Sequence, residues 1–340
     1  MTYQLPYGRQ WIDDDDIAAV INVLRADWLT QGPMVEAFEQ KIAEYVGSEY
    51  AVAFNSGTSA LHGAYFAAGV RIGDEIITSP ITFVATANAG MYLGARPVFV
   101  DINEKTWCVD IDTISEKISP HTKVIAPVDF AGYPVEIKSI LELAQDHSCI
   151  VVEDAAHALG AIRDGMKVGT EADMTIFSFH PVKHITTGEG GIVTTNNRDY
   201  AETMKRFRSH GITKDPKLLQ QHDGPWYYEM QDLGYNYRLT DVQCALGISQ
   251  LTKLEWFVTR RNEIARMYDD AFHGYENLMT PPKAPQGCRH AYHLYPVCFT
   301  GVERKKIFMD LREKGLFCQV HYIPVHLQPY YREKFGYREG

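Results

Sequence analysis

Short β-branched and apolar runs alternate with longer helix-like segments through the first two-thirds of this chain. The segments between the runs include Thr58–Ala68, Ala85–Leu93 and Ile137–His147. Strands that alternate with helices are typical of an α/β domain with a mostly parallel sheet, here of about seven strands. We expect strands at Tyr50–Phe54, Glu75–Thr78, Pro97–Asp101, Lys123–Val128, Cys149–Glu153, Met174–Phe179 and Gly191–Thr195.

The pattern changes after Leu239, which indicates a second, smaller domain. Thr240 is a plausible helix N-cap with Gln243 as its capping-box partner, and a long helix is expected to follow. A length of 340 residues suits two domains, which we place at residues 1–245 and 246–340. In the second domain we expect a strand at His293–Phe299, a helix at Lys305–Lys314 and a strand at Phe317–Tyr322.

Charge and composition restrict the partners and the compartment. The chain has 33 Lys and Arg against 43 Asp and Glu, a net charge of −10, which disfavours binding to nucleic acid. We find no run of about 18 apolar residues that would suit a membrane span. The N-terminus lacks a secretory pattern, and the six cysteines are scattered without CxxC spacing, so we expect a cytoplasmic protein with reduced thiols.

Several common catalytic motifs are absent from the sequence. It contains no GxGxxG after a strand, no P-loop, no HExxH and no GxSxG. His180 and His184 have a spacing that can suit a metal, but Pro181 lies between them and no third ligand is arranged nearby. We therefore expect no metal site.

Three polar segments follow predicted strands: Asn55–Ala60, Glu153–His157 and Ser178–Lys183. Ligands of open α/β sheets bind at the carboxyl ends of the strands. The first segment also opens a helix, whose free N–H groups, with the Thr58 and Ser59 hydroxyls, could hold a phosphate. Each segment alone is weak evidence, since a turn with an N-cap, loop-facing acids and a surface lysine are all ordinary.

Together the three segments match what pyridoxal phosphate (PLP) needs. Lys183 supplies an amine that can bind the cofactor covalently, and Asp154 can keep the ring nitrogen protonated. An exposed lysine with a pKa near ~10.4 is mostly protonated at neutral pH and is a poor base. We therefore expect burial and the nearby cationic ring of the cofactor to lower the pKa of Lys183.

The motifs resemble those of the DegT/DnrJ/EryC1/StrS family of PLP-dependent sugar aminotransferases. The resemblance covers essentially the whole chain, and it implies the fold-type-I, aspartate-aminotransferase-like architecture with a smaller C-terminal α/β domain. The segments that carry it are Ser56–Leu61, Ile81–Asn88, Glu153–Ala158, Ser178–Lys183, Gly234–Asp241 and His293–Pro296.

The resemblance also implies a role for each matching residue. Lys183 would bind PLP covalently, Asp154 would pair with the ring nitrogen, and Phe83 and His157 would lie on the two faces of the ring. The cofactor phosphate would bind to Gly57, Thr58, Ser59 and Ser178, and to Asn236 and Arg238 of a neighbouring subunit in a homodimer with shared sites. Substrate contacts would come from Tyr7, Asp27, Trp28, Leu29, Thr30, Gly57, Ser178, His321 and Tyr322.

The implied reaction moves an amino group from L-glutamate to C4 of a 4-keto nucleotide sugar. Three further segments resemble members that act in pseudaminic acid synthesis, which implies a UDP-linked 4-keto-6-deoxy-N-acetylhexosamine as the acceptor. Those segments are Phe207–Asp215, Gly224–Tyr228 and Gln319–His326.

Other functions stay open at this point. The chain could be an aminotransferase for another 4-keto sugar, of the perosamine or 4-amino-arabinose type. It could be a dehydratase of the same fold, although His replaces the lysine there and Lys183 is present. It could also be a non-catalytic regulator with a vestigial cofactor pocket, which Lys183 and Asp154 disfavour. Family members continue beyond the Phe335–Tyr337 region, so the resemblance implies an incomplete small domain in a chain that ends at Gly340.

Overall fold

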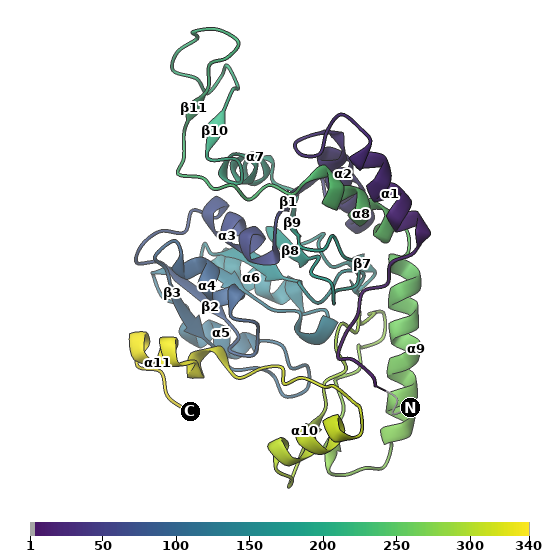
Figure 1. Ribbon diagram of the computed structural model, residues 1–340. Coiled ribbons are helices and arrows are strands. Elements are labelled where there is room, and N and C mark those ends of the chain that lie inside the picture. The colour runs from purple at the N-terminus through teal and green to yellow at the C-terminus, as the bar shows by residue number, and fades with distance from the viewer. Residues whose placement is uncertain (1–3, 340) are drawn as a thin grey trace.

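A computed structural model describes residues 4–339 as a central sheet covered by helices on both faces (Figure 1). The sheet has the order β1-β9-β8-β5-β4-β2-β3. Pairing is parallel from β8 to β3, whereas β9 runs antiparallel to both of its neighbours. The strands are β1 (Tyr50–Phe54), β2 (Glu75–Thr78), β3 (Arg96–Phe99), β4 (Thr122–Ala126), β5 (Ile150–Asp154), β8 (Met174–Ser178) and β9 (Gly191–Thr195).

These bounds confirm the expected strands to within two residues, and three of them to the residue. The strands are apolar along most of their length because helices bury both faces of the sheet. Val52 packs into the cluster on the face covered by α3, whereas its neighbour Ala53 packs on the opposite face. Helices near the sheet are α3 (Gly57–Ala67), α4 (Ala85–Met91), α5 (Ile111–Lys117), α6 (Ile137–Asp146) and α7 (Arg198–Phe207).

The run of four aspartates, Asp13 to Asp16, lies at the start of a helix. Asp13 caps α1 (Asp14–Leu24) by accepting the backbone N–H of Asp16, and acidic side chains in a first turn complement the helix dipole. Asp16 is itself buried and pairs with Lys253 at 2.8 Å. The α1 helix packs with α2 (Pro33–Val46) against α8 (Asp241–Leu251).

The capping box of Thr240 and Gln243 is confirmed, but the single long helix expected after it is wrong. The structure has two helices, α8 and α9 (Leu254–Phe272). They are separated at Thr252 and Lys253, where the Lys253 ammonium reaches back to Asp13 at 2.5 Å. The spacing of apolar residues along the chain does not predict such a contact between distant segments.

The prediction of two strands near the C-terminus, at His293–Phe299 and Phe317–Tyr322, is also largely wrong. Only Cys298–Phe299 (β13) of the first is a strand, paired with β12 (Leu278–Met279), and Phe317–Tyr322 is irregular. Backbone groups there bond to loops instead: Leu294 N–H donates to the Ala131 carbonyl at 3.2 Å, and Phe317 N–H donates to the Leu5 carbonyl at 3.0 Å.

The remaining elements are short, apart from the α10 helix, which agrees with expectation to within one residue. They are β6 (Ile162–Arg163), β7 (Met166–Lys167), β10 (Ile212–Thr213), β11 (Glu229–Met230), α10 (Arg304–Glu313), α11 (Pro329–Phe335) and the 3-10 turns Phe130–Gly132 and Val325–Leu327. The division of the chain at residue 245 stays a prediction. Among residues 4–339, no helix combines the length and hydropathy needed to cross a membrane.

A buried ion pair ties α2 to the sheet and gives a stability prediction. Glu39 accepts the Ala53 N–H at 2.8 Å and pairs with Arg208, whose guanidinium also donates to the Ala53 carbonyl at 2.6 Å. We expect Glu39→Ala to lower the free energy of unfolding by about 3–5 kcal/mol, because it leaves the partly buried Arg208 without its counter-charge. Urea unfolding followed by circular dichroism measures this loss.

The matched control is Glu263→Ala on the surface of α9. Glu263 pairs with Arg260 at 2.7 Å, and both side chains are exposed. The expected loss is below about 1 kcal/mol, since exposed pairs gain little in water. Equal losses in the two variants would contradict a structural role for the Glu39 pair.

Candidate active site

Lys183 and Asp154 lie together at the carboxyl edge of the parallel strands. Asp154 ends β5, and Lys183 lies in the loop between β8 and β9, which contains no helix. Burial lowers the pKa of Lys183 to about 8, and the negative charge of Asp154 opposes this shift. The neutral fraction of the amine near neutral pH is therefore larger than that of an exposed lysine, and the neutral form is the one that accepts a proton.

Asp154 is buried and held by two hydrogen bonds. Thr86 Oγ1 donates to its Oδ2 at 2.6 Å, and the Ala156 N–H donates to its Oδ1 at 3.2 Å. Burial raises the pKa of Asp154, whereas these two donors and Lys183 act to lower it. A carboxylate supported in this way can stabilise a protonated ring nitrogen next to it.

The N-terminus of α3 faces the end of β8. Ser56 caps this helix, and its capping box engages both the backbone N–H and the hydroxyl of Ser59. A Cβ added at Gly57 would lie 3.2 Å from Ser178 Cβ and 3.3 Å from Ser178 Oγ, so glycine permits this close approach. Ser178 thus adjoins the helix start, where the early N–H groups favour an anion.

His157 and Tyr322 form the wall beside Lys183. The two rings stack with centroids 6.4 Å apart, and the Tyr322 hydroxyl lies 3.3 Å from His157 Nε2. His157 Nδ1 faces the Ala131 N–H at 3.3 Å, which makes Nδ1 the acceptor. Burial and the positive charge of Lys183 hold the pKa of His157 well below its usual range. Phe83 is 58% exposed, with its ring 6.5 Å from that of Tyr322.

Two predicted substrate residues meet although 314 positions separate them. The Tyr7 hydroxyl lies 2.8 Å from His321 Nε2, and the two rings stack at 5.2 Å. A backbone bridge between Leu5 and Leu316 fixes the same two segments to each other. Since His321 adjoins Tyr322, the N-terminal segment borders the wall beside Lys183.

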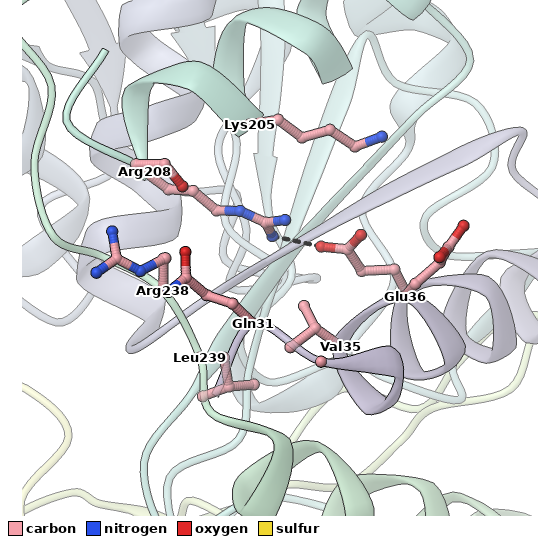
Figure 2. Close-up of a pocket in the computed structure, with 10 residues that line it drawn as sticks. Gln31, Val35, Glu36, Lys205, Arg208, Arg238 and Leu239 are labelled. Atoms are coloured by element: carbon pink, nitrogen blue, oxygen red, sulfur yellow. Dashed lines mark hydrogen bonds and ion pairs between the residues drawn. The ribbon is translucent and has the colours of Figure 1, made fainter. Parts of the chain in front are cut away.

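Other predicted site residues lie at a second place, near the turn between α1 and α2. Thr30 forms a backbone bridge with Thr240, and Trp28 and Leu29 are mostly exposed. Arg238 lines a cavity of about 350 Å³ there with Gln31, Lys205 and Arg208 (Figure 2). Asn236 contacts the first polar segment, because its carbonyl accepts the Asn55 side-chain amide at 3.4 Å. The described contacts of Asp27–Thr30 do not reach Lys183.

Sequence reasoning missed two residues that contact the proposed catalytic groups. Thr86 belongs to the quoted motif Ile81–Asn88 and binds Asp154. His293 belongs to the quoted motif His293–Pro296 and lies 3.5 Å from Lys183. Both motifs lie in segments that contribute to the site, but the sequence did not indicate which of their side chains would contact Asp154 or Lys183.

The donor set fits PLP. A buried amine suits its aldehyde, a buried carboxylate suits its ring nitrogen, and a helix N-terminus beside a serine suits its phosphate. The close approach of Gly57 to Ser178 supports the last assignment, since a larger residue would crowd the space between them. These features define a fold-type-I aminotransferase site.

The similarity of this chain to known proteins supports the assignment to the aminotransferases. Residues 10–340 match the model of the DegT/DnrJ/EryC1/StrS aminotransferase family. The chain is 40% identical over 338 residues to a UDP-4-amino-4,6-dideoxy-N-acetyl-beta-L-altrosamine transaminase of Campylobacter jejuni, covering 98% of this chain and 87% of that protein. The chain therefore belongs to the DegT/DnrJ/EryC1/StrS aminotransferase family.

Two solved structures are similar over almost the whole chain. Helicobacter pylori PseC, an aminotransferase involved in the biosynthesis of pseudoaminic acid, has a TM-score of 0.92 at 35% identity, covering 99% of this chain and 90% of that one. The PLP form of the putative sugar aminotransferase Spr1654 from Streptococcus pneumoniae has a TM-score of 0.90 at 29% identity, covering 97% and 88%. The predicted class is thus confirmed: this chain is a PLP-dependent sugar aminotransferase of fold type I.

Proposed function

We propose that this enzyme transfers the amino group of L-glutamate to C4 of a UDP-linked 4-keto-6-deoxy-N-acetylhexosamine. The product would be UDP-4-amino-4,6-dideoxy-N-acetyl-β-L-altrosamine, an intermediate of pseudaminic acid synthesis. The observation that carries the amino-transfer part is the buried Lys183 amine beside Asp154 and its Thr86 donor. The choice of sugar is supported by the named activity of the Campylobacter relative and by the likeness to PseC.

The chain's own residues would divide the work as follows. PLP, when bound, supplies the group that accepts the amino group and delocalises the electrons of the reacting carbon. Asp154 would keep the ring nitrogen protonated, and Gly57, Thr58, Ser59 and Ser178 would orient the phosphate, with Ser59 acting through the helix start that it helps to cap. Once it is no longer bound to PLP, Lys183 would move the proton to C4 of the sugar, acting first as a base and then as an acid.

Substrate contacts and the oligomer are part of the same proposal. Tyr7, His321 and Tyr322 would contact the sugar nucleotide from within the subunit, next to Phe83 and His157. Asn236, Arg238 and the exposed stretch Asp27–Thr30 would serve the site of a second copy in a homodimer. The cavity at Arg238 is lined by three basic residues, Lys205, Arg208 and Arg238, and by two acidic ones, Glu36 and Glu39. Arg208 pairs with Glu39, so the basic groups left to contact a phosphate of a partner site are Lys205 and Arg238. The free cysteines support a cytoplasmic location.

The test is a panel of UDP- and dTDP-linked 4-keto sugars incubated with the purified protein, PLP and L-glutamate. We expect 2-oxoglutarate to form with the UDP-linked 4-keto-6-deoxy-N-acetylhexosamine of the L-arabino configuration. NMR coupling constants of the product should give the C4 configuration of the altrosamine and not that of its C4 epimer. Turnover of a perosamine or 4-amino-arabinose precursor alone would overturn the sugar assignment, and no turnover of any sugar would overturn the proposed activity.

A further inference from the structure

His293 contacts Lys183 and has no role among the residues assigned so far. Its side chain is buried, and its Nε2 lies 3.5 Å from Lys183 Nζ. Its ring centroid is 4.4 Å from that of His157, so the imidazole contacts both His157 and Lys183. An apolar ring could fill the same space, so packing alone does not explain why a polar ring is buried against a reactive amine. This contact therefore suggests a chemical role for the imidazole.

The fold fixes the position of this imidazole from its backbone. Arg261 on α9 donates from Nη1 to the carbonyls of Tyr292 at 3.1 Å and His293 at 3.3 Å. The Leu294 N–H donates to the Ala131 carbonyl at 3.2 Å. These three hydrogen bonds hold the backbone at His293, and the burial of its ring restricts the side chain. The four-carbon stem of a lysine, by contrast, has many rotamers.

The surroundings of His293 keep it neutral. The titratable and charged groups that face it are Lys183, His157, His184 and Arg261, all basic. Burial and these groups hold the pKa of His293 well below its usual range. Its Nδ1 is buried and has no hydrogen-bond partner among residues 4–339. Because buried N–H groups without a partner are rarer than bare acceptors, the proton belongs on Nε2, which faces Lys183.

We propose that His293 is a positioning residue for Lys183: its Nε2–H donates to the free amine and holds it where it can exchange a proton with the substrate carbon. This inference rests on the proposed function of Lys183. The 3.5 Å separation is at the outer limit of a hydrogen bond, so the contact orients the amine without tying up its lone pair strongly. Donation to the amine also favours its neutral form, the form that accepts a proton.

The first test measures Lys183 in the full-length protein before PLP is added. Competitive acetylation with acetic anhydride at pH 7, followed by mass spectrometry, gives the labelling rate of Lys183 relative to exposed Lys138. We expect His293→Leu to reduce this ratio about threefold or more, because the neutral amine loses its donor. His293→Gln places an amide nitrogen near the position of Nε2 and should stay within about twofold of the wild type.

The second test uses the PLP-loaded enzyme. His293→Leu should lower kcat by about tenfold or more, leave both KM values within about twofold, and increase the isotope effect with glutamate deuterated at Cα. His293→Gln should recover most of kcat. The control is His184→Gln: His184 is 5.8 Å from the His293 ring, but its Nε2 bonds to the Ala291 carbonyl at 3.0 Å. We expect wild-type labelling of Lys183 in this control.

Two results would overturn the inference. Wild-type labelling and kcat in His293→Leu would show that the contact has no function. Equal losses in His293→Leu, His293→Gln and His184→Gln would show a packing role only. The labelling arm needs neither substrate nor PLP, so it still decides the role of His293 if the wild-type enzyme fails to convert any sugar.

Discussion

Lys183→Ala is expected to abolish amino transfer, with kcat reduced by on the order of 10³-fold or more. The side chain supplies both the amine that would bind PLP and the base that would move the proton, and no second lysine touches the same site among the described contacts in residues 4–339. Initial rates of 2-oxoglutarate formation from glutamate and the 4-keto sugar measure the loss. Mass spectrometry after borohydride reduction should find the cofactor on the Lys183 peptide of the wild type only.

The matched control is Lys138→Ala. Lys138 lies at the surface, 3.7 Å from Glu171, and has no place in the proposed site. Its removal should leave kcat within about twofold of the wild type, since exposed ion pairs contribute little. Full turnover by Lys183→Ala, with the cofactor still attached to the protein, would disprove the role given to Lys183.

Asp154→Asn should lower kcat/KM by on the order of 10²-fold or more. Asparagine keeps an oxygen that can accept from Thr86 Oγ1, but it carries no charge to stabilise a protonated ring nitrogen. The loss should therefore come from the electrostatics of the site rather than from its shape. Kinetics with both substrates and the dissociation constant of PLP, compared at pH 6.5, measure the effect.

Glu153 offers a close control because it is the neighbouring residue and is equally buried. Burial raises the pKa of Glu153 to about 7, so this side chain is mostly a neutral acid at pH 6.5. It accepts a hydrogen bond from Thr175 Oγ1 at 2.8 Å, which a glutamine oxygen can replace. We expect Glu153→Gln to retain activity within about threefold. A loss as large as that of Asp154→Asn would argue for a general effect of this strand on folding.

Much of the sheet was predictable because its strands are buried on both faces. Runs such as Tyr50–Phe54 and Gly191–Thr195 carry a local signal that survives in the fold, and both bounds agree with the prediction. The polar segments at the strand ends were predictable for the same reason: once strands are parallel, their carboxyl ends meet at one edge. Lys183 and Asp154 therefore came together as expected.

The C-terminal third was less predictable because its contacts are between distant residues. His293–Val297 and Phe317–Tyr322 look like strands, yet the bonds to Ala131 and Leu5 hold irregular backbone there. At the break between α8 and α9, Lys253 pairs with Asp13 at the start of α1. No local pattern contains such information, because each contact requires that another element already be in place.

The sheet, the cofactor chemistry and the family could be inferred from the sequence, because each depends on residue types at short spacing along the chain. The surroundings of the reactive amine could not, because they form only when the chain folds. Thr86 approaches Asp154 across 68 positions, Tyr322 approaches His157 across 165, and His293 approaches Lys183 across 110. Such contacts tune charge and position through burial and hydrogen bonds, which only the folded chain creates.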